Sequence, residues 1–163
     1  MRIGLVSEYY PPYTSGGAEW STQLLAQELA ARPEIERVVV ITPNHGAASL
    51  EATGNLVVER FAFPFKLHKK RIHPYGLLAN PLFYGYSAWQ IMRLVRKYKL
   101  DVLHVQNKQS VVGAVWAARW AKIPVVVTLR DVMLLCRFGM CLNHYNEQPQ
   151  GCDWQTYGQC LRE

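Results

Sequence analysis

Apolar residues along the chain form two kinds of pattern, short continuous runs and longer stretches with helical spacing. The continuous runs, typical of strands buried in a sheet, are residues 2–7, 37–42, 56–63 (the weakest), 101–106 and 125–129. The stretches with helical spacing are residues 18–31, 82–99 and 110–121. The resulting order, β-α-β-β-α-β-α-β, predicts an α/β fold. We expect a Rossmann-like, mainly parallel sheet with helices on both faces.

Individual positions support these helices. In the first, the recurring apolar residues are Trp20, Leu24, Leu25 and Leu29, and Pro33 ends the pattern. In the second, Ala88, Ile91, Met92 and Val95 share one face, while Arg93, Arg96 and Lys97 lie mostly on the other. Residues 43–54 are predicted to be a loop, and residues 65–81 irregular structure or a short surface helix.

The predicted sheet places its candidate chemistry at one edge, because such sheets bind ligands at the carboxyl ends of their strands. That edge receives residues 7–17, residues 106–110 and the chain from Arg130 onward. Gly16 and Gly17 precede a helix, where backbone N–H groups and the helix dipole suit an anion. The spacing is neither the dinucleotide fingerprint nor a P-loop. By itself, the pair fits equally well a simple turn in which Glu19 complements the helix dipole.

Two further candidates lie on or near this edge. His104 is inside a predicted strand, where a core histidine is as reasonable as a functional one. Arg130 and Asp131 follow the last strand; the guanidinium suits a phosphate or carboxylate better than proton transfer, because it does not deprotonate. An ion pair that fastens the following segment is the structural alternative. The sequence contains neither a G-x-S-x-G nor an H-E-x-x-H motif.

Composition narrows the class of protein. The chain has 163 residues, 50% hydrophobic and 18% charged, which excludes a disordered protein. It contains no apolar run of about 20 residues that would span a membrane. The first residues turn polar at Ser7, without the apolar segment of a signal peptide, so we expect a cytoplasmic protein.

The charge is unevenly distributed, although the net value is only +6. No acidic residue lies between Glu59 and Asp101, whereas residues 60–100 contain nine Lys and Arg residues and nine aromatic ones. This combination indicates a local anionic partner. The densest cations are Lys66, Lys69, Lys70 and Arg71, which we expect to contact the inner face of the cell membrane. A merely solvated segment is the alternative, and nucleic acid is disfavoured because no nucleic-acid-binding motif accompanies the charge.

Four cysteines lie in the last part of the chain, at Cys136, Cys141, Cys152 and Cys160. Their spacing leaves two interpretations open. A structural zinc site usually includes a closely spaced pair, which only Cys136 and Cys141 approach, with His144 as a further ligand. Free or paired thiols are the favoured alternative.

Three segments, in order, resemble one enzyme family. They are Tyr10-Pro11-Pro12 leading to Gly16-Gly17-Ala18-Glu19, then Asp101-Val102-Leu103-His104, and then residues 124–131, Pro-Val-Val-Val-Thr-Leu-Arg-Asp. Together they resemble the N-terminal half of a retaining glycosyltransferase of the GT-B fold, in family 4 (group 1). The resemblance covers about four-fifths of the chain. Its most specific element is the one that ends in Gly-Gly-Ala-Glu.

The resemblance implies a hexosyltransferase-type enzyme with two Rossmann-like domains. The N-terminal domain would bind the acceptor, a glycan or a lipid-linked glycan of bacterial surface-polysaccharide assembly. The C-terminal domain would bind the nucleotide sugar, the co-substrate. Neither a cofactor nor a divalent metal would be required, because backbone N–H groups and basic side chains stabilise the leaving diphosphate.

The same resemblance assigns roles to residues of this chain. Gly16 and Gly17 would meet the donor diphosphate, and Arg130 and Asp131 would be catalytic. The acceptor would contact Glu19, Gln106 and Asn107. Many family members carry His where this chain has Arg130, so a role that depends on that His is not expected here.

The predicted domain organisation is a Rossmann-like acceptor-binding domain over residues 1–131 and a cysteine-containing segment over residues 132–163, which we expect to pack on the same domain. We expect the family's C-terminal donor-binding domain to lie outside these 163 residues. We therefore expect these 163 residues alone to have no transferase activity. The competing function is a non-catalytic Rossmann-like module that binds an anion or a membrane.

Overall fold

The structure is a computed structural model that describes residues 1–14, 16–62 and 81–130. The chain divides into two units, Met1–Thr128 and Leu129–Glu163. Of the second unit only Leu129 and Arg130 are described, and both are exposed. The architecture below is that of the first unit.

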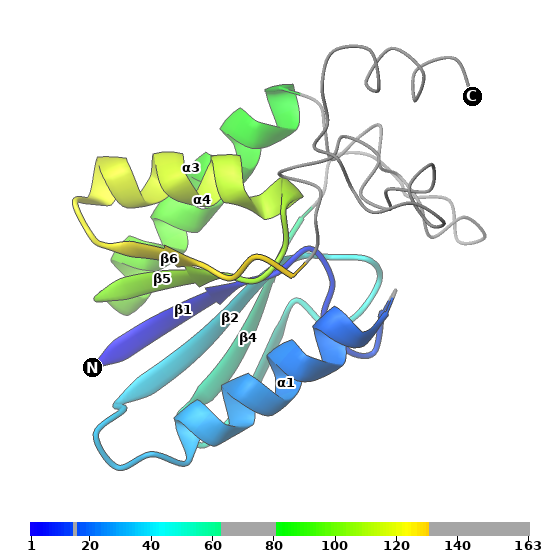
Figure 1. The fold of residues 1–163 in the computed structure, drawn as a ribbon, viewed down its shortest axis with the longest axis vertical. Coiled ribbons are helices and arrows are strands. Elements are labelled where there is room, and N and C mark those ends of the chain that lie inside the picture. Colours follow the sequence, from blue (N-terminus) through cyan, green and yellow to red (C-terminus); the bar gives the residue numbers. More distant parts are fainter. Residues whose placement is uncertain (15, 63–80, 131–163) are drawn as a thin grey trace, which may run out of the picture. The chain divides into compact units, whose positions relative to one another are not determined.

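A six-stranded sheet forms the centre of the described chain (Figure 1). Its strands are β1 (Arg2–Val6), β2 (Arg37–Pro43), β3 (Leu50–Thr53), β4 (Leu56–Phe61), β5 (Val102–Val105) and β6 (Val125–Val127). They lie in the order β3-β4-β2-β1-β5-β6. Every pairing is parallel except β3 with β4, which are antiparallel. The predicted α/β fold with a mainly parallel sheet is therefore confirmed.

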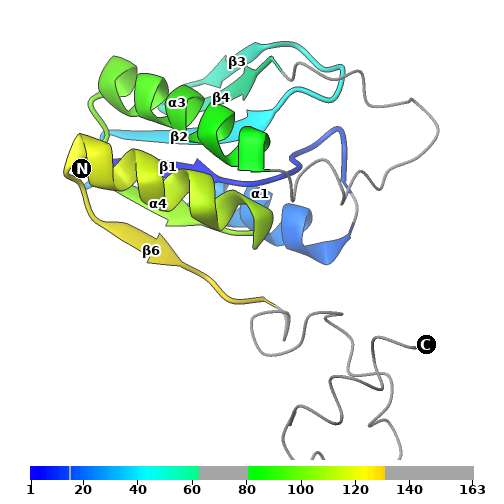
Figure 2. The same cartoon turned by 90° about the horizontal axis from the view of Figure 1, so that it is seen from above.

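Helices cover both faces of this sheet. The helix α1 (Gly17–Ala30) lies on one face, and α3 (Pro81–Tyr98) and α4 (Gln109–Ala121) lie side by side on the other (Figures 1 and 2). Each face has its own apolar core, because alternate residues of a strand point to opposite faces. For example, Leu5 packs in the core beneath α1, and its neighbour Val6 packs in the core beneath α3 and α4.

The structure adds one strand to the predicted order. Residues 43–54 were expected to be a loop, but β3 lies within them and forms a hairpin with β4 around Gly54, whose φ is +60°. All four residues of β3 are exposed. An exposed edge strand lacks the apolar run by which a buried strand is recognised, which explains the error.

The first helix exists where predicted, but its apolar residues do not all face the core. Trp20 and Leu24 are 55% and 62% exposed. The buried positions are Glu19, Thr22 and Ala26, with Leu25 and Leu29 packed beside them. Trp20 and Leu24 therefore lie on the outer side of the helix, whereas Leu25 and Leu29 reach the core.

The two helices on the other face approach each other at Gly113 of α4. A Cβ atom at this position would lie 2.3 Å from Ser87 Oγ and 3.3 Å from the backbone nitrogen of Ala88, both in α3. We therefore expect Gly113→Val to lower the free energy of unfolding by about 2 kcal/mol. Urea unfolding measures this loss. The matched control is Gly85→Val in α3, where a Cβ atom meets nothing within 4 Å. Equal losses in both variants would contradict the close approach at Gly113.

Candidate functional site

The candidate site lies at the carboxyl ends of β1 and β5. These strands are neighbours, but the chain leaves β1 toward β2 and leaves β5 toward β6, on opposite sides of the sheet. Such a point, where the strand order reverses, is called a topological switch point, and α/β proteins commonly bind ligands there. The loop after β1 leads to Gly16 and α1, and the loop after β5 leads directly into α4. Two helix N-termini therefore begin at this edge.

Polar contacts join the two strand ends. Ser7 Oγ lies 2.7 Å from Asn107 Oδ1 and 2.7 Å from the Tyr9 carbonyl oxygen. The Glu8 backbone N–H donates to the same Asn107 oxygen at 3.4 Å, and the Gln106 N–H donates to the Val6 carbonyl at 2.9 Å. Ser7 and Gln106 are fully buried. The predicted edge residues Gln106 and Asn107 are thus brought against the loop that follows β1.

Glu8 occupies the N-terminus of α4. Its carboxylate accepts a hydrogen bond of 2.6 Å from the Gln109 backbone N–H. The Gln109 side chain, oriented with its amide nitrogen toward Glu8, donates to the carboxylate as well. The Glu8 side chain follows β1, and the N–H belongs to the helix that follows β5. This hydrogen bond therefore joins the ends of the two neighbouring strands.

Burial controls the protonation of this carboxyl group. Glu8 is 5% exposed. Desolvation raises the pKa of Glu8 from 4.5 to about 7, and the nearby charge of Glu19 acts in the same direction. The hydrogen bond from the Gln109 N–H and the charge of Lys108 lower this pKa but do not offset the burial. Glu8 is therefore a carboxyl group that exchanges its proton close to neutral pH.

The glycine pair stands at the start of α1. Gly16 and Gly17 are both exposed. The Gly16 N–H donates to Glu19 Oε2 at 2.9 Å, and Glu19 is 2% exposed. A Cβ atom at Gly17 would meet nothing within 4 Å, so open space lies over this residue. Glu19 therefore takes one backbone donor of the helix end, and Gly17 leaves room for a ligand beside it.

His45, in the loop after β2, packs against the loop that follows β1. Its Nε2 lies 2.9 Å from the Glu8 carbonyl oxygen. Its ring stacks on Tyr9 with 4.6 Å between ring centroids. Burial lowers the pKa of His45, and the contact with the Glu8 carbonyl opposes that shift. His45 thus fastens the chain just after β1 to the end of β2.

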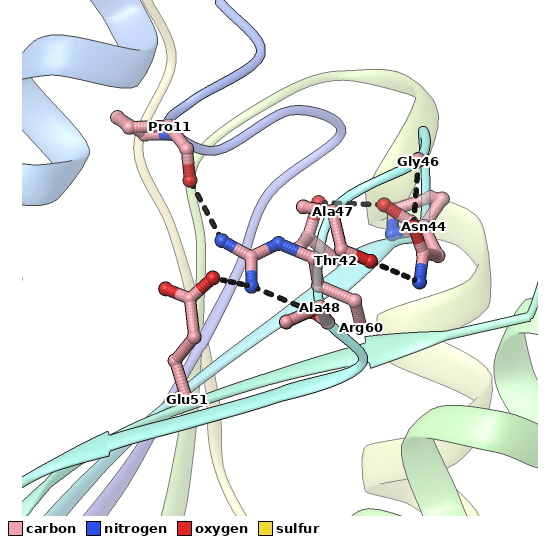
Figure 3. A network of polar contacts seen from close by, with 9 residues as sticks. Pro11, Thr42, Asn44, Gly46, Ala47, Ala48, Glu51 and Arg60 are labelled. Atoms are coloured by element: carbon pink, nitrogen blue, oxygen red, sulfur yellow. Dashed lines mark hydrogen bonds and ion pairs between the residues drawn. The ribbon is translucent and has the colours of Figure 1, made fainter.

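A buried arginine contacts the loop after β1 at Pro11 (Figure 3). Arg60 of β4 donates to the Pro11 carbonyl at 2.7 Å, the Ala48 carbonyl at 2.9 Å and Glu51 Oε1 at 2.8 Å. The guanidinium is planar and carries several donors, so it can join three segments at once. It connects the Pro-Pro segment before the glycine pair to the β3–β4 hairpin.

Two residues of the strand motif at 101–104 have structural partners. Asp101 lies at the opposite end of the sheet and accepts hydrogen bonds from the Arg2 N–H at 2.6 Å and the Arg2 guanidinium at 3.2 Å. These bonds hold the pKa of Asp101 below its usual value. The His104 Nε2 lies 2.7 Å from Thr128 Oγ1, which connects β5 to the end of β6.

The predicted site residues fall into three groups. The described edge of the sheet carries Gly16, Gly17, Glu19, Gln106 and Asn107. Arg130 is described only as exposed. Outside the described residues lie Asp131, Lys66, Lys69, Lys70, Arg71, Cys136, Cys141, Cys152 and Cys160. The roles assigned to all of these residues stay predictions.

Sequence reasoning missed Glu8 and His45. The sequence analysis places residues 7–17 at the binding edge but gives Glu8 no role. The available signal was a carboxylate directly after a buried apolar strand, where a parallel sheet carries its functional side chains. His45 offered no such signal, since only the folded chain brings the loop after β2 beside the loop after β1.

Among the described residues, no group of three or more His, Cys, Asp or Glu side chains is arranged to hold a metal ion. In that same part of the chain, none of the helices has the length and apolar character needed to cross a bilayer.

Comparison with known proteins decides the family. The family described as Glycosyltransferase Family 4 matches residues 15–157. The chain belongs to glycosyltransferase family 4. The resemblance to family 4 seen in the sequence is thereby confirmed, and the matched residues of this glycosyltransferase family 4 domain include the glycine pair and the loop after β5.

One curated protein and two solved structures are also similar to this chain. The domain is 29% identical over 143 residues to the "Uncharacterized 42.6 kDa protein in cps region" of Klebsiella pneumoniae, covering 83% of this chain and 38% of that protein. Among solved structures, it matches sucrose-phosphate synthase from Thermosynechococcus elongatus with a TM-score of 0.62 and 18% identity, covering 90% of this chain and 37% of that one. HepE of Anabaena, in complex with UDP and glucose, matches with a TM-score of 0.45 and 20% identity over 80% of this chain and 30% of that one.

The likeness to the sucrose-phosphate synthase supports the α/β fold of the family 4 domain. The chain spans well under half the length of the Klebsiella protein and of both matched structures.

Proposed function

We propose that this family 4 domain is the acceptor-binding half of a retaining glycosyltransferase. The enzyme transfers a sugar from a nucleotide-sugar donor to a glycan or lipid-linked acceptor in surface-polysaccharide assembly. The relative from the cps region of Klebsiella pneumoniae is the comparison that bears on this pathway. Attachment to the inner face of the cell membrane belongs to the same proposal, through Lys66, Lys69, Lys70 and Arg71.

The observation that carries the proposal is the open space over Gly17 at the N-terminus of α1. The first N–H groups of a helix have no partner within the helix, and the helix dipole adds positive potential there. A diphosphate oxygen can approach this helix end because no atom of the described residues lies within 4 Å of a Cβ position on Gly17. The Arg60 and Glu8 contacts hold the two loops beside it, so the site is formed before the ligand arrives.

This geometry supports one part of the reaction, the stabilisation of the leaving diphosphate. As the bond between the sugar's anomeric carbon and the diphosphate breaks, negative charge grows on the diphosphate oxygens. Backbone N–H groups that are already oriented stabilise that charge without moving. The acceptor hydroxyl oxygen forms the new bond to the same carbon, on the face that the diphosphate leaves, and its proton passes to an oxygen of the departing diphosphate.

The test is a donor and acceptor screen with the purified full-length protein. Release of nucleoside diphosphate is measured for a series of nucleotide sugars, each with and without a lipid-linked glycan acceptor. We expect one donor to be turned over, with retention of its anomeric configuration and without loss of rate in a chelator of divalent metals. NMR of the product determines the configuration. If the protein binds nucleoside diphosphates but transfers no sugar from any donor, the non-catalytic anion-binding module is the better description.

A further inference from the structure

Two buried carboxylates lie at the edge of the sheet where the donor diphosphate is proposed to bind. Glu8 accepts the backbone N–H of Gln109 at the start of α4. Glu19 accepts the backbone N–H of Gly16 at the start of α1. Both helices begin at the edge of the sheet toward which β1 runs (Figure 1). The ligand edge therefore holds two acidic groups of the chain itself, one at each helix end.

The two carboxylates influence each other electrostatically. Burial raises the pKa of Glu8 most, and the negative charge of Glu19 raises it further. A diphosphate beside Gly17 would lie next to the helix end that Glu19 contacts, and would bring more negative charge to the same place. Negative charge near a carboxylate favours its protonated form, because like charges repel. A bound diphosphate would thus act on Glu8 in the same direction as Glu19 does.

The other groups around Glu8 come from α4 and from the loop after β2. Lys108, directly before α4, is a cation whose charge lowers the pKa of Glu8, and a backbone hydrogen bond from Ser110 acts in the same direction. His45 Nε2 lies 2.9 Å from the Glu8 carbonyl oxygen. Since burial lowers the pKa of His45, its ring is already neutral where Glu8 exchanges its proton. Proton exchange near neutral pH therefore falls on Glu8 rather than on His45.

The Gln109 side chain suits both protonation states of Glu8. This buried amide lies against the carboxyl group, and an amide has a donor side and an acceptor side. With its nitrogen toward Glu8, it donates to the carboxylate ion. Turned over, it presents its carbonyl oxygen, which accepts the O–H of the protonated acid. Glu8 can therefore gain or lose a proton in place and keep a hydrogen-bond partner in both states.

We propose that Glu8 takes up a proton when the donor diphosphate binds at the start of α1, so that donor binding is coupled to pH. The proton comes from solvent and bonds to a carboxylate oxygen of Glu8, which removes one negative charge from the edge that receives the diphosphate. The acid's carbonyl oxygen still accepts the Gln109 backbone N–H, so the two strand ends stay joined. This inference rests on the proposed function, because it takes the diphosphate to bind beside Gly17.

The experiment measures proton uptake by isothermal titration calorimetry. The full-length protein is titrated at about pH 7.5 with UDP, GDP, ADP and dTDP in turn, in HEPES and in Tris. These buffers differ in their heat of ionisation, so the difference in observed heat gives the number of protons taken up. A bound diphosphate that raises the pKa of Glu8 from about 7 by about one unit should cause uptake of about half a proton. Donor affinity should fall as the pH rises, by about eightfold between pH 6 and pH 9 relative to Glu8→Gln.

Three variants separate Glu8 from other titrating groups. Glu8→Gln keeps the shape of the side chain without the titration, and should take up about half a proton fewer than the wild type. The terminal phosphate and His45 titrate in both proteins, so their contributions cancel. Glu28→Gln removes an exposed carboxylate of α1 and should keep the wild-type uptake. Lys108→Gln removes a cation that lowers the pKa of Glu8, so the pH of maximal uptake should move upward.

The outcomes distinguish this coupling from the proposed function. Equal proton uptake by the wild type and a folded Glu8→Gln variant would overturn the coupling and leave the proposed function intact. An unchanged uptake profile in Lys108→Gln would overturn it as well, and this test applies even if Glu8→Gln does not fold. Thermal unfolding establishes which variants are folded. A protein that binds none of the four nucleotides would overturn the proposed function and this inference together.

Discussion

Gly17→Val should reduce sugar transfer by at least about a hundredfold in the full-length protein while the fold survives. The valine side chain would fill the space over the N-terminus of α1 that we assign to the donor diphosphate. The fold should survive because a Cβ atom at Gly17 meets nothing within 4 Å and the residue is exposed. The measurement is kcat and KM for the donor, with thermal unfolding in parallel.

Two further variants make this result interpretable. Gly17→Ala adds only the Cβ atom and should give an intermediate loss. Leu24→Val places a β-branched residue at an exposed position in the same helix, away from the glycine pair, and should leave activity unchanged. Normal turnover in a folded Gly17→Val variant would remove this helix end from the active site.

Glu8→Gln should change the way stability depends on pH. The pKa of Glu8 in the folded chain is about 7, above its usual 4.5, so the folded state binds this proton more tightly than the unfolded state. The stability that the protonated group contributes is fully present below pH 4.5 and is lost as the pH rises through 7. Between pH 4.5 and pH 8, the wild type should therefore lose about 3 kcal/mol relative to Glu8→Gln, which stays neutral.

Urea unfolding at both pH values measures this difference. His45 titrates as well, and since burial lowers its pKa, its own contribution to stability is lost on acidification. It is present in both proteins, so it cancels when the two are compared at the same pH. Glu28→Gln, at an exposed position of α1, serves as the control for removing a carboxylate. If the free energies of unfolding of the wild type and of Glu8→Gln change in parallel from pH 4.5 to pH 8, Glu8 is not buried as described.

The two predictions concern the two helix N-termini at one edge of the sheet. Glu8 carries a carboxylate to the N-terminus of α4, and Glu19 carries one to the N-terminus of α1. In the described structure, each helix end is thus contacted by an acid of the chain itself. A diphosphate that binds at Gly17 meets a helix end where one N–H is already taken, which makes the space over the glycine pair important for its approach.

The order of strands and helices could be predicted because it depends on short-range patterns. Runs such as 37–42 are apolar on both faces, which in a soluble chain requires a sheet covered by helices on both sides. The position of helix α3 and its buried and exposed faces were predicted correctly. Ile91 and Val95 are buried, and Arg93 and Arg96 are exposed. The glycine pair and the Gln106–Asn107 segment could also be placed at one edge, since parallel strands share their direction.

Other features required the tertiary structure, because they depend on which segments meet. The strand β3 is exposed along its whole length, so its residues do not show the apolar pattern by which a buried strand is predicted. Trp20 and Leu24 have helical spacing, yet the side of α1 that packs on the sheet carries Ala26, Leu25 and Leu29 instead. No local pattern distinguishes an apolar helix stripe that faces a sheet from one that faces outward.

The chemistry of the site divides in the same way. The sequence by itself determined the α/β fold, the family and the glycine pair at the start of a helix, because these depend on residue type and spacing. Only the tertiary structure placed Glu8 at the N-terminus of α4, about a hundred residues away in the chain, and buried it there. A pKa depends on desolvation and neighbouring charges rather than on residue type, so the near-neutral pKa of Glu8 could not be predicted from the sequence.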